Sequence, residues 1–349
     1  MTAIDPGYNL GMKPFLDSTG LLAGGTGLYR RMKRDGYLFI RNVLPKRDLE
    51  SLRTEWLLKL EEAGWLQKNS SPAEGLADPD AFYVEPQDAY MDVLHEVYRL
   101  RSFHALQQHP NLLRFLERML GGGVIPHPRL IGRVIFPQRD EYTTPPHQDF
   151  INIQGTQETY TAWIPLSSLA AEMGGLQIAA GSHRGGVYDF RPSLGAGGLA
   201  VTEPLENAWV NSPIEQGDVI IFHSMVVHKG LPNRGDRLRL SIDGRYQRVS
   251  DPITADSLKP HDRRHSWEAI YADWPAADPL KYYWRQWELR IETFDASYFE
   301  RRDQMGLELA AQGDPDSRSI LERIIARDPD PAKRGQAAKL LSGLDLEDL

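Results

Sequence analysis

The stretch GDVIIFHSMVVHKGLPNR, residues 217–234, passes from a strongly apolar strand pattern into a loop that contains glycine and proline. Other short strand patterns, also bounded by Gly and Pro, lie at 129–136, 159–166, 175–180 and 238–246. Many short strands separated by such residues are typical of a β-sandwich or a barrel-like jelly roll. The stretch therefore predicts a mainly β core.

Helical patterns flank this core. On the N-terminal side, the sequence predicts a short helix that stops at Gly36, a strand at 37–43, and a second helix after Pro45. Helical periodicity returns at 89–120, and the chain becomes helical again from Asp278. We expect an α+β fold in which a double-stranded β-helix, of jelly-roll or cupin type, is flanked by N-terminal helices and followed by a C-terminal helical extension.

Three parts of the chain are predicted: an N-terminal arm at 1–27, the β-rich domain with its flanking helices at 28–260, and the helical extension at 261–349. The polar, proline-containing segment at 67–88 is long enough to be a lid over a site, although an exposed loop explains it equally well.

The extension contains a short internal repeat. Asp314-Pro315-Asp316 and Asp328-Pro329-Asp330 each predict the start of a short helix, because an aspartate cap and an early proline both suit the unpaired N–H groups there. We interpret these helices as a packing or oligomerisation appendage, with a scaffold for a protein partner as the alternative.

Composition narrows the classes of partner. The formal net charge of −8 argues against a nucleic-acid or anionic-membrane partner, since both require a basic surface, and favours a small-molecule substrate. The chain has no cysteine, so any metal must be held by His, Asp or Glu. The N-terminus does not resemble a signal peptide and no apolar stretch reaches membrane-spanning length, so we expect a cytoplasmic protein that could form a homo-oligomer through its C-terminal helices.

The segment TTPPHQDF, residues 143–150, supplies two candidate metal ligands. His147 and Asp149 stand two positions apart, so on an extended segment their side chains share one face. Two histidines and one carboxylate form the facial triad that suits non-haem Fe(II). The third ligand would come from residues 217–234. We favour His228, because His223 ends an apolar strand where a structural or supporting histidine is the more frequent case.

Arginines follow this segment in RLRLSIDGRY, residues 237–246. A planar guanidinium beside a metal is a suitable clamp for a carboxylate such as that of 2-oxoglutarate, because it offers paired donors. Arg133 lies on the strand predicted before the HxD segment. It would anchor an acidic substrate group if it pointed inward, and an outward surface arginine is the alternative.

Four ordered blocks resemble the phytanoyl-CoA dioxygenase family of Fe(II)- and 2-oxoglutarate-dependent oxygenases. They are DGYLFIRNVLP, PPHQDF, TAWIPLSSLAAEMGGLQIAAGSHRGG and GDVIIFHSMVVHKGLPNRGDRLRLS, and the resemblance spans roughly residues 30 to 250. One departure is Ala180, where the family usually has proline before Gly-Ser-His, and this affects a turn only.

The resemblance implies roles for individual residues. It implies that His147, Asp149 and His228 bind Fe(II), and that Arg239 pairs with the distal carboxylate of 2-oxoglutarate. Trp163 would line the cosubstrate pocket, although it is equally explained as a core aromatic residue. Apart from the resemblance, Thr161 lies near the iron loop and is a candidate for cosubstrate contact, with turn formation as the competing explanation. Near the iron loop, Gln154 and Thr156 are candidates for substrate contact, with turn formation as the competing explanation.

The activity that the resemblance implies is hydroxylation of an unactivated C–H bond in a small, acidic or secondary-metabolite substrate, with O2 consumed and succinate and CO2 released. Halogenating relatives have a small residue in place of the carboxylate, so Asp149 favours oxygen transfer. Desaturation, cyclisation and epimerisation use the same ligands and remain alternatives. Two others are a cupin-like metal-binding protein or oxidase that does not use 2-oxoglutarate, and an interaction protein in which the helical tail is the working part.

Overall fold

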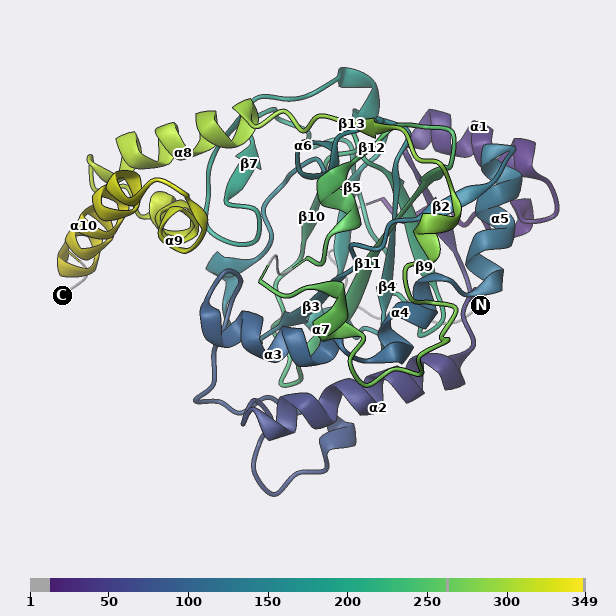
Figure 1. Cartoon of the computed structure of the whole chain (residues 1–349), viewed down its shortest axis with the longest axis horizontal. Coiled ribbons are helices and arrows are strands. Elements are labelled where there is room, and N and C mark those ends of the chain that lie inside the picture. The colour runs from purple at the N-terminus through teal and green to yellow at the C-terminus, as the bar shows by residue number, and fades with distance from the viewer. Residues whose placement is uncertain (1–12, 262–263, 348–349) are drawn as a thin grey trace.

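The structure is a computed structural model that describes residues 13–261 and 264–347, and it combines helices with antiparallel sheets (Figure 1). The main sheet has the strand order β1-β9-β4-β11-β2, and β3 lies along β11. Its strands are β1 (Tyr37–Ile40), β2 (Val124–Pro126), β3 (Ile131–Ile135), β4 (Tyr160–Pro165), β9 (Val219–His223) and β11 (Arg239–Arg248). The predicted strands of the core are all present, and the sheets do not close into a barrel.

A smaller antiparallel sheet has the order β10 (His228–Gly230), β5 (Leu176–Ala179) and β8 (Trp209–Val210). Strand β9 shows how the layers form. Ile220 and Phe222 pack in one apolar cluster with Ile178 of the smaller sheet, whereas Val219 and Ile221 belong to the cluster that contains the helices. Because side chains alternate along a strand, one apolar run fills both sides of the main sheet.

Short pairs of strands complete the β structure. They are an antiparallel pair, β6 (Phe190–Pro192) with β7 (Leu199–Val201), and a parallel pair, β12 (Ile253–Thr254) with β13 (Ile291–Glu292). The 3-10 helices lie at Thr19–Leu21, Pro72–Glu74, Asp140–Tyr142, Ala171–Met173, Ser182–Gly185, Ala255–Leu258, Tyr283–Gln286 and Pro315–Ser317.

The N-terminal helices are α1 (Gly25–Asp35), α2 (Lys46–Glu62), α3 (Asp88–Tyr98), α4 (Arg101–Gln107) and α5 (Pro110–Leu120). Helix α1 ends at Gly36, whose φ of 77° is the left-handed conformation that glycine adopts at low cost. The prediction of helix at 89–120 is confirmed, but three helices form instead of one. Pro110 contributes to the last break, because a proline disfavours helical backbone in the residue before it.

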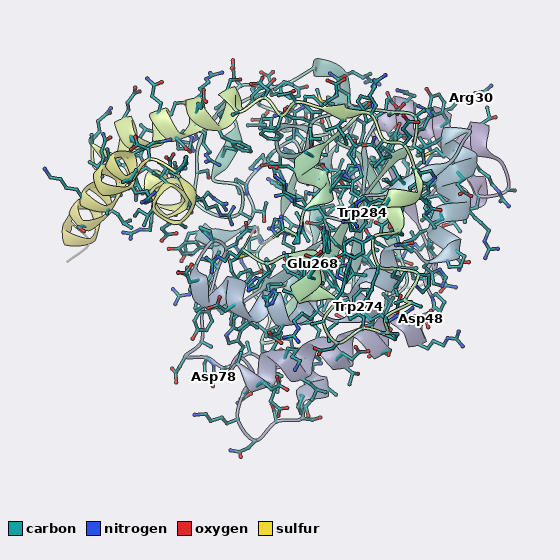
Figure 2. The ribbon with its side chains drawn as sticks, viewed as in Figure 1. Arg30, Asp48, Asp78, Glu268, Trp274 and Trp284 are labelled. Carbon is teal, nitrogen blue, oxygen red and sulfur yellow. The ribbon has the colours of Figure 1, made fainter. Side chains whose placement is uncertain are left out.

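Helices α6 (Phe150–Ile153) and α7 (Trp267–Ile270) are single turns, and the chain ends in α8 (Ser297–Ala310), α9 (Arg318–Arg327) and α10 (Pro331–Glu347). The prediction of helix from Asp278 is wrong as far as residue 296. There the aromatic side chains pack individually on the body: Trp284 is buried in the helical core and the hydroxyl of Tyr283 donates to the carbonyl of Pro126. Figure 2 shows Trp274 and Trp284 over the main body. Packing of these rings outweighs the helical pattern.

Helices α8, α9 and α10 pack on one another beside the main body (Figure 1). Both repeated Asp-Pro-Asp motifs start helices as predicted. Asp314 accepts a hydrogen bond from the N–H of Asp316, and Asp330 accepts one from the N–H of Ala332. Across the described residues, no helix is long and apolar enough to span a membrane.

Gly132 sets how closely β3 approaches the N-terminal helices. A Cβ at this position would lie 2.8 Å from the Trp56 ring of α2 and 3.2 Å from Leu94 of α3. Gly132→Ala should therefore lower the free energy of unfolding by about 1–3 kcal/mol through overpacking. Urea and thermal unfolding of the purified variant measure this loss.

Gly122→Ala is the matched control, because a Cβ there meets no atom within 4 Å. It should change the free energy of unfolding by no more than about 0.5 kcal/mol. Equal losses in the two variants would contradict the close packing of β3 on α2.

Candidate metal centre and adjoining cavities

His147, Asp149 and His228 converge in the structure. Each offers a ligand atom that lies within 4.8 Å of the other two, and all three side chains are buried. The backbones of His147 and His228 exchange two hydrogen bonds, of 2.9 and 3.0 Å from N to O. Asp149 precedes the single turn α6. Two segments far apart in sequence are thus held side by side at the point where their imidazoles meet.

The hydrogen bonds of the two imidazoles fix which nitrogen carries the proton. Nδ1 of His147 lies 2.8 Å from the carbonyl oxygen of Pro145, and Nδ1 of His228 lies 3.1 Å from that of Val226. A carbonyl oxygen only accepts, so both Nδ1 atoms are the donors. Each Nε2 is therefore left with a lone pair for a metal ion.

Burial sets the charge states of these ligands. It lowers the pKa of His147 to about 3, with repulsion from His228 adding to the effect, and it lowers the pKa of His228 as well. Burial alone would raise the pKa of Asp149, but Arg245 and the two imidazoles hold it well below its usual range. Neutral imidazoles and an ionised carboxylate are the protonation states in which these groups bind metals.

Two neighbours orient the Asp149 carboxylate. The Thr161 hydroxyl donates to Oδ2 at 2.6 Å, and Nη2 of the buried Arg245 donates to Oδ1 at 3.2 Å. Oδ1 lies 3.8 Å from Nε2 of His147, close enough for one ion to contact both. Two imidazoles and one carboxylate, converging and buried, fit Fe(II). Thr161 was expected to contact the cosubstrate, and the structure places it against this carboxylate instead.

One cavity extends from the triad to Arg239. It is lined by Trp163 and Ser241 as well as by the triad. Nη1 of Arg239 donates to the carbonyl oxygens of Met173 and Leu231, at 2.9 and 2.8 Å, whereas the buried Nε has no partner among the described residues. Burial lowers the pKa of Arg239 to about 10, so the guanidinium is charged at neutral pH. Trp163 lines this cavity and also belongs to the apolar core.

Strand β11 aims alternate residues at the cavities. Arg239, Ser241 and Asp243 line the one just described, and Arg245 lines a larger one. Arg237 precedes the strand and its side chain is 51% exposed. Asp243 and Arg245 are site residues that the sequence reasoning missed, although the two-residue period of the strand pointed to them.

His223 lies outside the triad. Its Nε2 is 3.7 Å from Oε1 of Glu158, and its ring packs against Tyr160 and His183. The structure therefore supports His228 over His223 as the third member of the triad.

Gln154 and Thr156 line neither cavity in the described part of the chain. The Gln154 side chain bonds to the backbone of Ile151 and Asp295, and the Thr156 hydroxyl accepts from the N–H of Glu158. Their hydrogen bonds are those of turns and segment packing, so the substrate contacts expected of them find no support.

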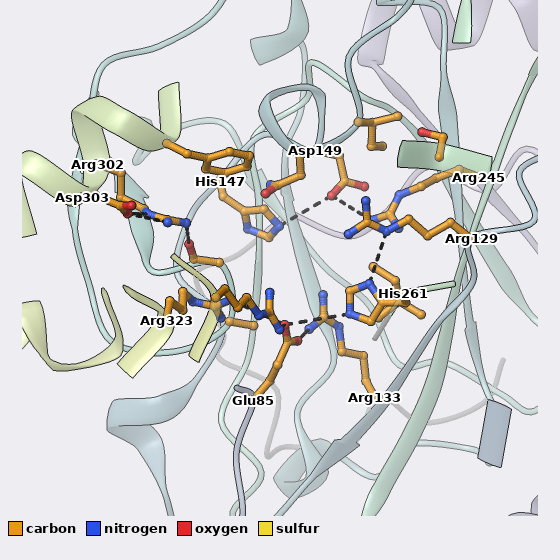
Figure 3. Close-up of a pocket in the computed structure, with 18 of the residues that line it drawn as sticks. Glu85, Arg129, Arg133, His147, Asp149, Arg245, His261, Arg302, Asp303 and Arg323 are labelled. Carbon is orange, nitrogen blue, oxygen red and sulfur yellow. Dashed lines mark hydrogen bonds and ion pairs between the residues drawn. The ribbon is translucent and has the colours of Figure 1, made fainter. Parts of the chain in front are cut away.

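The larger cavity has a volume of about 240 Å³, and His147 and Asp149 form part of its lining (Figure 3). Arg133 faces it and forms ion pairs with Glu85 at 3.0 Å and Asp243 at 3.2 Å, so the surface alternative for Arg133 is wrong. Among the described residues that line this cavity, arginines outnumber carboxylates. The arginines are 129, 133, 245, 302, 323 and 327, and the carboxylates are Glu85, Asp149, Asp303 and Asp328.

Several of these residues come from segments that no local motif connects with the triad. Glu85 lies near the end of the polar segment 67–88, and the C-terminal helices contribute Arg302, Arg323 and Arg327. Only the tertiary structure brings them to the cavity.

Comparison with known proteins gives a family match. Residues 32–241 match the family model described as phytanoyl-CoA dioxygenase (PhyH). The chain is 27% identical over 269 residues to the 1-deoxypentalenic acid 11-beta-hydroxylase of Streptomyces exfoliatus, covering 71% of this chain and 90% of the relative. For the Streptomyces arenae enzyme of the same name, the identity is 29% over 262 residues, covering 70% and 89%.

Among solved structures, the epimerase SnoN in complex with Fe3+, alpha ketoglutarate and nogalamycin RO superposes with a TM-score of 0.47. Its sequence identity is 21%, and the match covers 65% of this chain and 84% of SnoN.

The triad predicts how single substitutions change metal affinity. His228→Ala should weaken Mn(II) binding about 100-fold or more, because a buried ligand is lost. His223→Ala should leave the affinity within about threefold of the parent chain. Anaerobic titration calorimetry of the two variants makes the comparison. If His223→Ala lost Mn(II) binding and His228→Ala kept it, His223 would be the third ligand.

Proposed function

Because the chain belongs to the phytanoyl-CoA dioxygenase family, we propose that it hydroxylates an unactivated C–H bond of a small-molecule substrate, using Fe(II), 2-oxoglutarate and O2. The observation that carries the proposal is the buried convergence of His147, Asp149 and His228 beside the buried guanidinium of Arg239.

Fe(II) would be held by Nε2 of both histidines and by the Asp149 carboxylate, and three protein ligands leave positions open for other ligands. When bound, it supplies the redox chemistry that couples O2 to the oxidation of two carbon compounds. The overall reaction balances as C–H plus 2-oxoglutarate plus O2 giving C–OH plus succinate plus CO2. Arg245 and Thr161 keep Asp149 ionised and oriented throughout.

Arg239 would bind the distal carboxylate of 2-oxoglutarate. Its Nη1 is committed to two backbone carbonyls, which fixes the plane of the guanidinium, and its Nε–H is left for a ligand. A buried charge that lacks a carboxylate partner is costly, and an acidic cosubstrate removes that cost. The buried Trp163 forms an apolar wall of the same cavity. These features favour 2-oxoglutarate dependence over a cupin-like oxidase that lacks a cosubstrate.

The larger cavity would hold the prime substrate. Its excess of arginines favours an acidic molecule, and the two Streptomyces relatives are named for hydroxylation of a carboxylic acid. The carboxylate of Asp149 argues against halogenation, and desaturation, cyclisation and epimerisation, which use the same ligands, are alternatives to hydroxylation. We also infer that the two facing sheets are the double-stranded β-helix of the 28–260 domain, and that the chain acts in the cytoplasm. Oligomerisation through α8–α10 stays a prediction.

The assignment of Arg239 predicts a selective defect. Arg239→Ala should raise the 2-oxoglutarate concentration needed for half-maximal succinate formation about 10- to 100-fold, because a charge-assisted contact is lost. Mn(II) affinity should change by less than about threefold. Succinate release under air and calorimetry without O2 measure the two quantities.

Arg237→Ala is the matched control, since that exposed side chain lines neither cavity in the described part of the chain. A defect in Arg237→Ala with none in Arg239→Ala would refute the clamp. The proposed function would be refuted if the parent chain formed no 2-oxoglutarate-dependent succinate with any member of a panel of carboxylic acids.

A further inference from the structure

Arg323 reaches the larger cavity from α9, in the C-terminal extension (Figure 3). Its side chain is only 6% exposed. Burial lowers its pKa to about 10, so the guanidinium is still protonated at neutral pH. The family match ends at residue 241, so this arginine belongs to a part of the chain outside that match.

The hydrogen-bonding capacity of Arg323 is largely unused. Nη1 lies 3.6 Å from Oε1 of Glu85, which is an ion pair with no close hydrogen bond. Nε and Nη2 are buried and have no partner among the residues that the structure describes. Buried N–H groups without a partner cost free energy, and a charged group costs more. A ligand that accepts from both atoms would remove this cost.

The two unused donors define the shape of that ligand. Nε–H and the outer Nη2–H of a guanidinium point the same way along one edge, and their spacing matches the two oxygens of a carboxylate. The chain itself shows this pairing: Nε and Nη2 of Arg34 donate to Oδ1 and Oδ2 of Asp35, each at 2.7 Å. Arg323 presents the same edge without a carboxylate.

The carboxylates nearby do not compensate Arg323. Glu85 is shared with Arg133 at 3.0 Å and with Arg327 at 3.7 Å. Arg133 also pairs with Asp243 at 3.2 Å, so two carboxylates face three arginines.

Other acidic residues of the wall have cations of their own. Asp303 pairs with Arg302 at 2.5 Å and with Lys333 at 3.0 Å, and Lys333 also pairs with Asp328 at 2.6 Å. The region around Arg323 therefore keeps an excess of positive charge.

Arg323 and the triad lie on opposite sides of the same cavity. Figure 3 shows Arg323 and Glu85 across the cavity from His147 and Asp149. A molecule whose acidic end rests at Arg323 would extend its carbon skeleton toward the metal ligands.

We propose that Arg323 binds a carboxylate of the prime substrate through Nε and Nη2, and that the C-terminal helices thereby form part of the substrate site. This proposal rests on the proposed function, because it takes the molecule bound at Arg323 to be the one that the enzyme oxidises. It assigns to α9 a role in substrate orientation, where the sequence indicated only packing or oligomerisation.

Paired neutral and charged probes test the proposal. Calorimetry on the full chain, with Fe(II) and saturating 2-oxoglutarate under anaerobic conditions, compares cyclohexanecarboxylate with cyclohexanecarboxamide. Because 2-oxoglutarate occupies Arg239, the probe reports on the larger cavity. The parent chain should bind the acid about tenfold or more tightly than the amide, as expected of a charge-assisted pair of hydrogen bonds. A smaller preference would overturn the proposal without any variant.

Variants test whether Arg323 causes the preference for the acid over the amide. Arg323→Gln should reduce it to about threefold or less, and Arg323→Lys, which keeps the charge but not the edge, should fall between. Arg301→Gln is the control, because Arg301 is an exposed arginine of α8 that pairs with Asp189. An unchanged preference in Arg323→Gln, or an equal loss in Arg301→Gln, would overturn the assignment.

Failure of the proposed function gives a different result. If the parent chain forms no 2-oxoglutarate-dependent succinate, the oxygenase assignment fails, while the acid-to-amide ratio still reports on Arg323. If succinate forms but the ratio does not depend on Arg323, the oxygenase stands and the carboxylate site is wrong.

Discussion

The site depends on the two backbone hydrogen bonds that His147 and His228 exchange. These bonds join a loop after a proline pair to the first residue of β10, and β10 is in turn paired with β5 of the smaller sheet. These bonds thus set the separation of the two backbones, and the Nδ1 hydrogen bonds of the two rings orient the imidazoles. Asp149 follows two residues later, so the same contact also carries the carboxylate into place. Loss of this pairing would disperse all three groups at once.

Charge compensation is the second constraint. A metal ion is the group that would satisfy the convergent lone pairs at the triad, and Arg245 already offsets Asp149. Arg239 and Arg323, in contrast, are buried cations with unused N–H groups on two sides of the triad. Burying a cation without a partner costs free energy, and groups of this kind are frequent at binding and catalytic sites. Two such positions suit an enzyme with two acidic ligands, one on each side of the metal.

The sequence predicted those parts of the molecule that have a local period or motif. His147 and Asp149 could be found from the spacing of the HxD segment, although Asp149 has a helical and not an extended backbone. The apolar run of β9 was an equally clear signal. The prediction of a helix after Asp278 failed because the aromatic residues there suit a helix face and a set of separate core contacts equally well. Those contacts lie in distant parts of the chain, such as Pro126 of β2 for Tyr283. Glu85 and Arg323 had no signal, since an isolated charged residue in a loop or helix is ordinarily solvated. Their importance arises from burial, which only the folded chain defines.

Strand β11 contributes Arg239, Ser241, Asp243 and Arg245 to the cavities from alternate positions, and it is held by β2, β3 and β4 together. A slip of one residue in that pairing would turn all four groups toward the helices and bring apolar residues to the metal side. The placement of Arg239 in its cavity and the contact of Arg245 with Asp149 therefore depend on one strand register, and a change of register would remove both together.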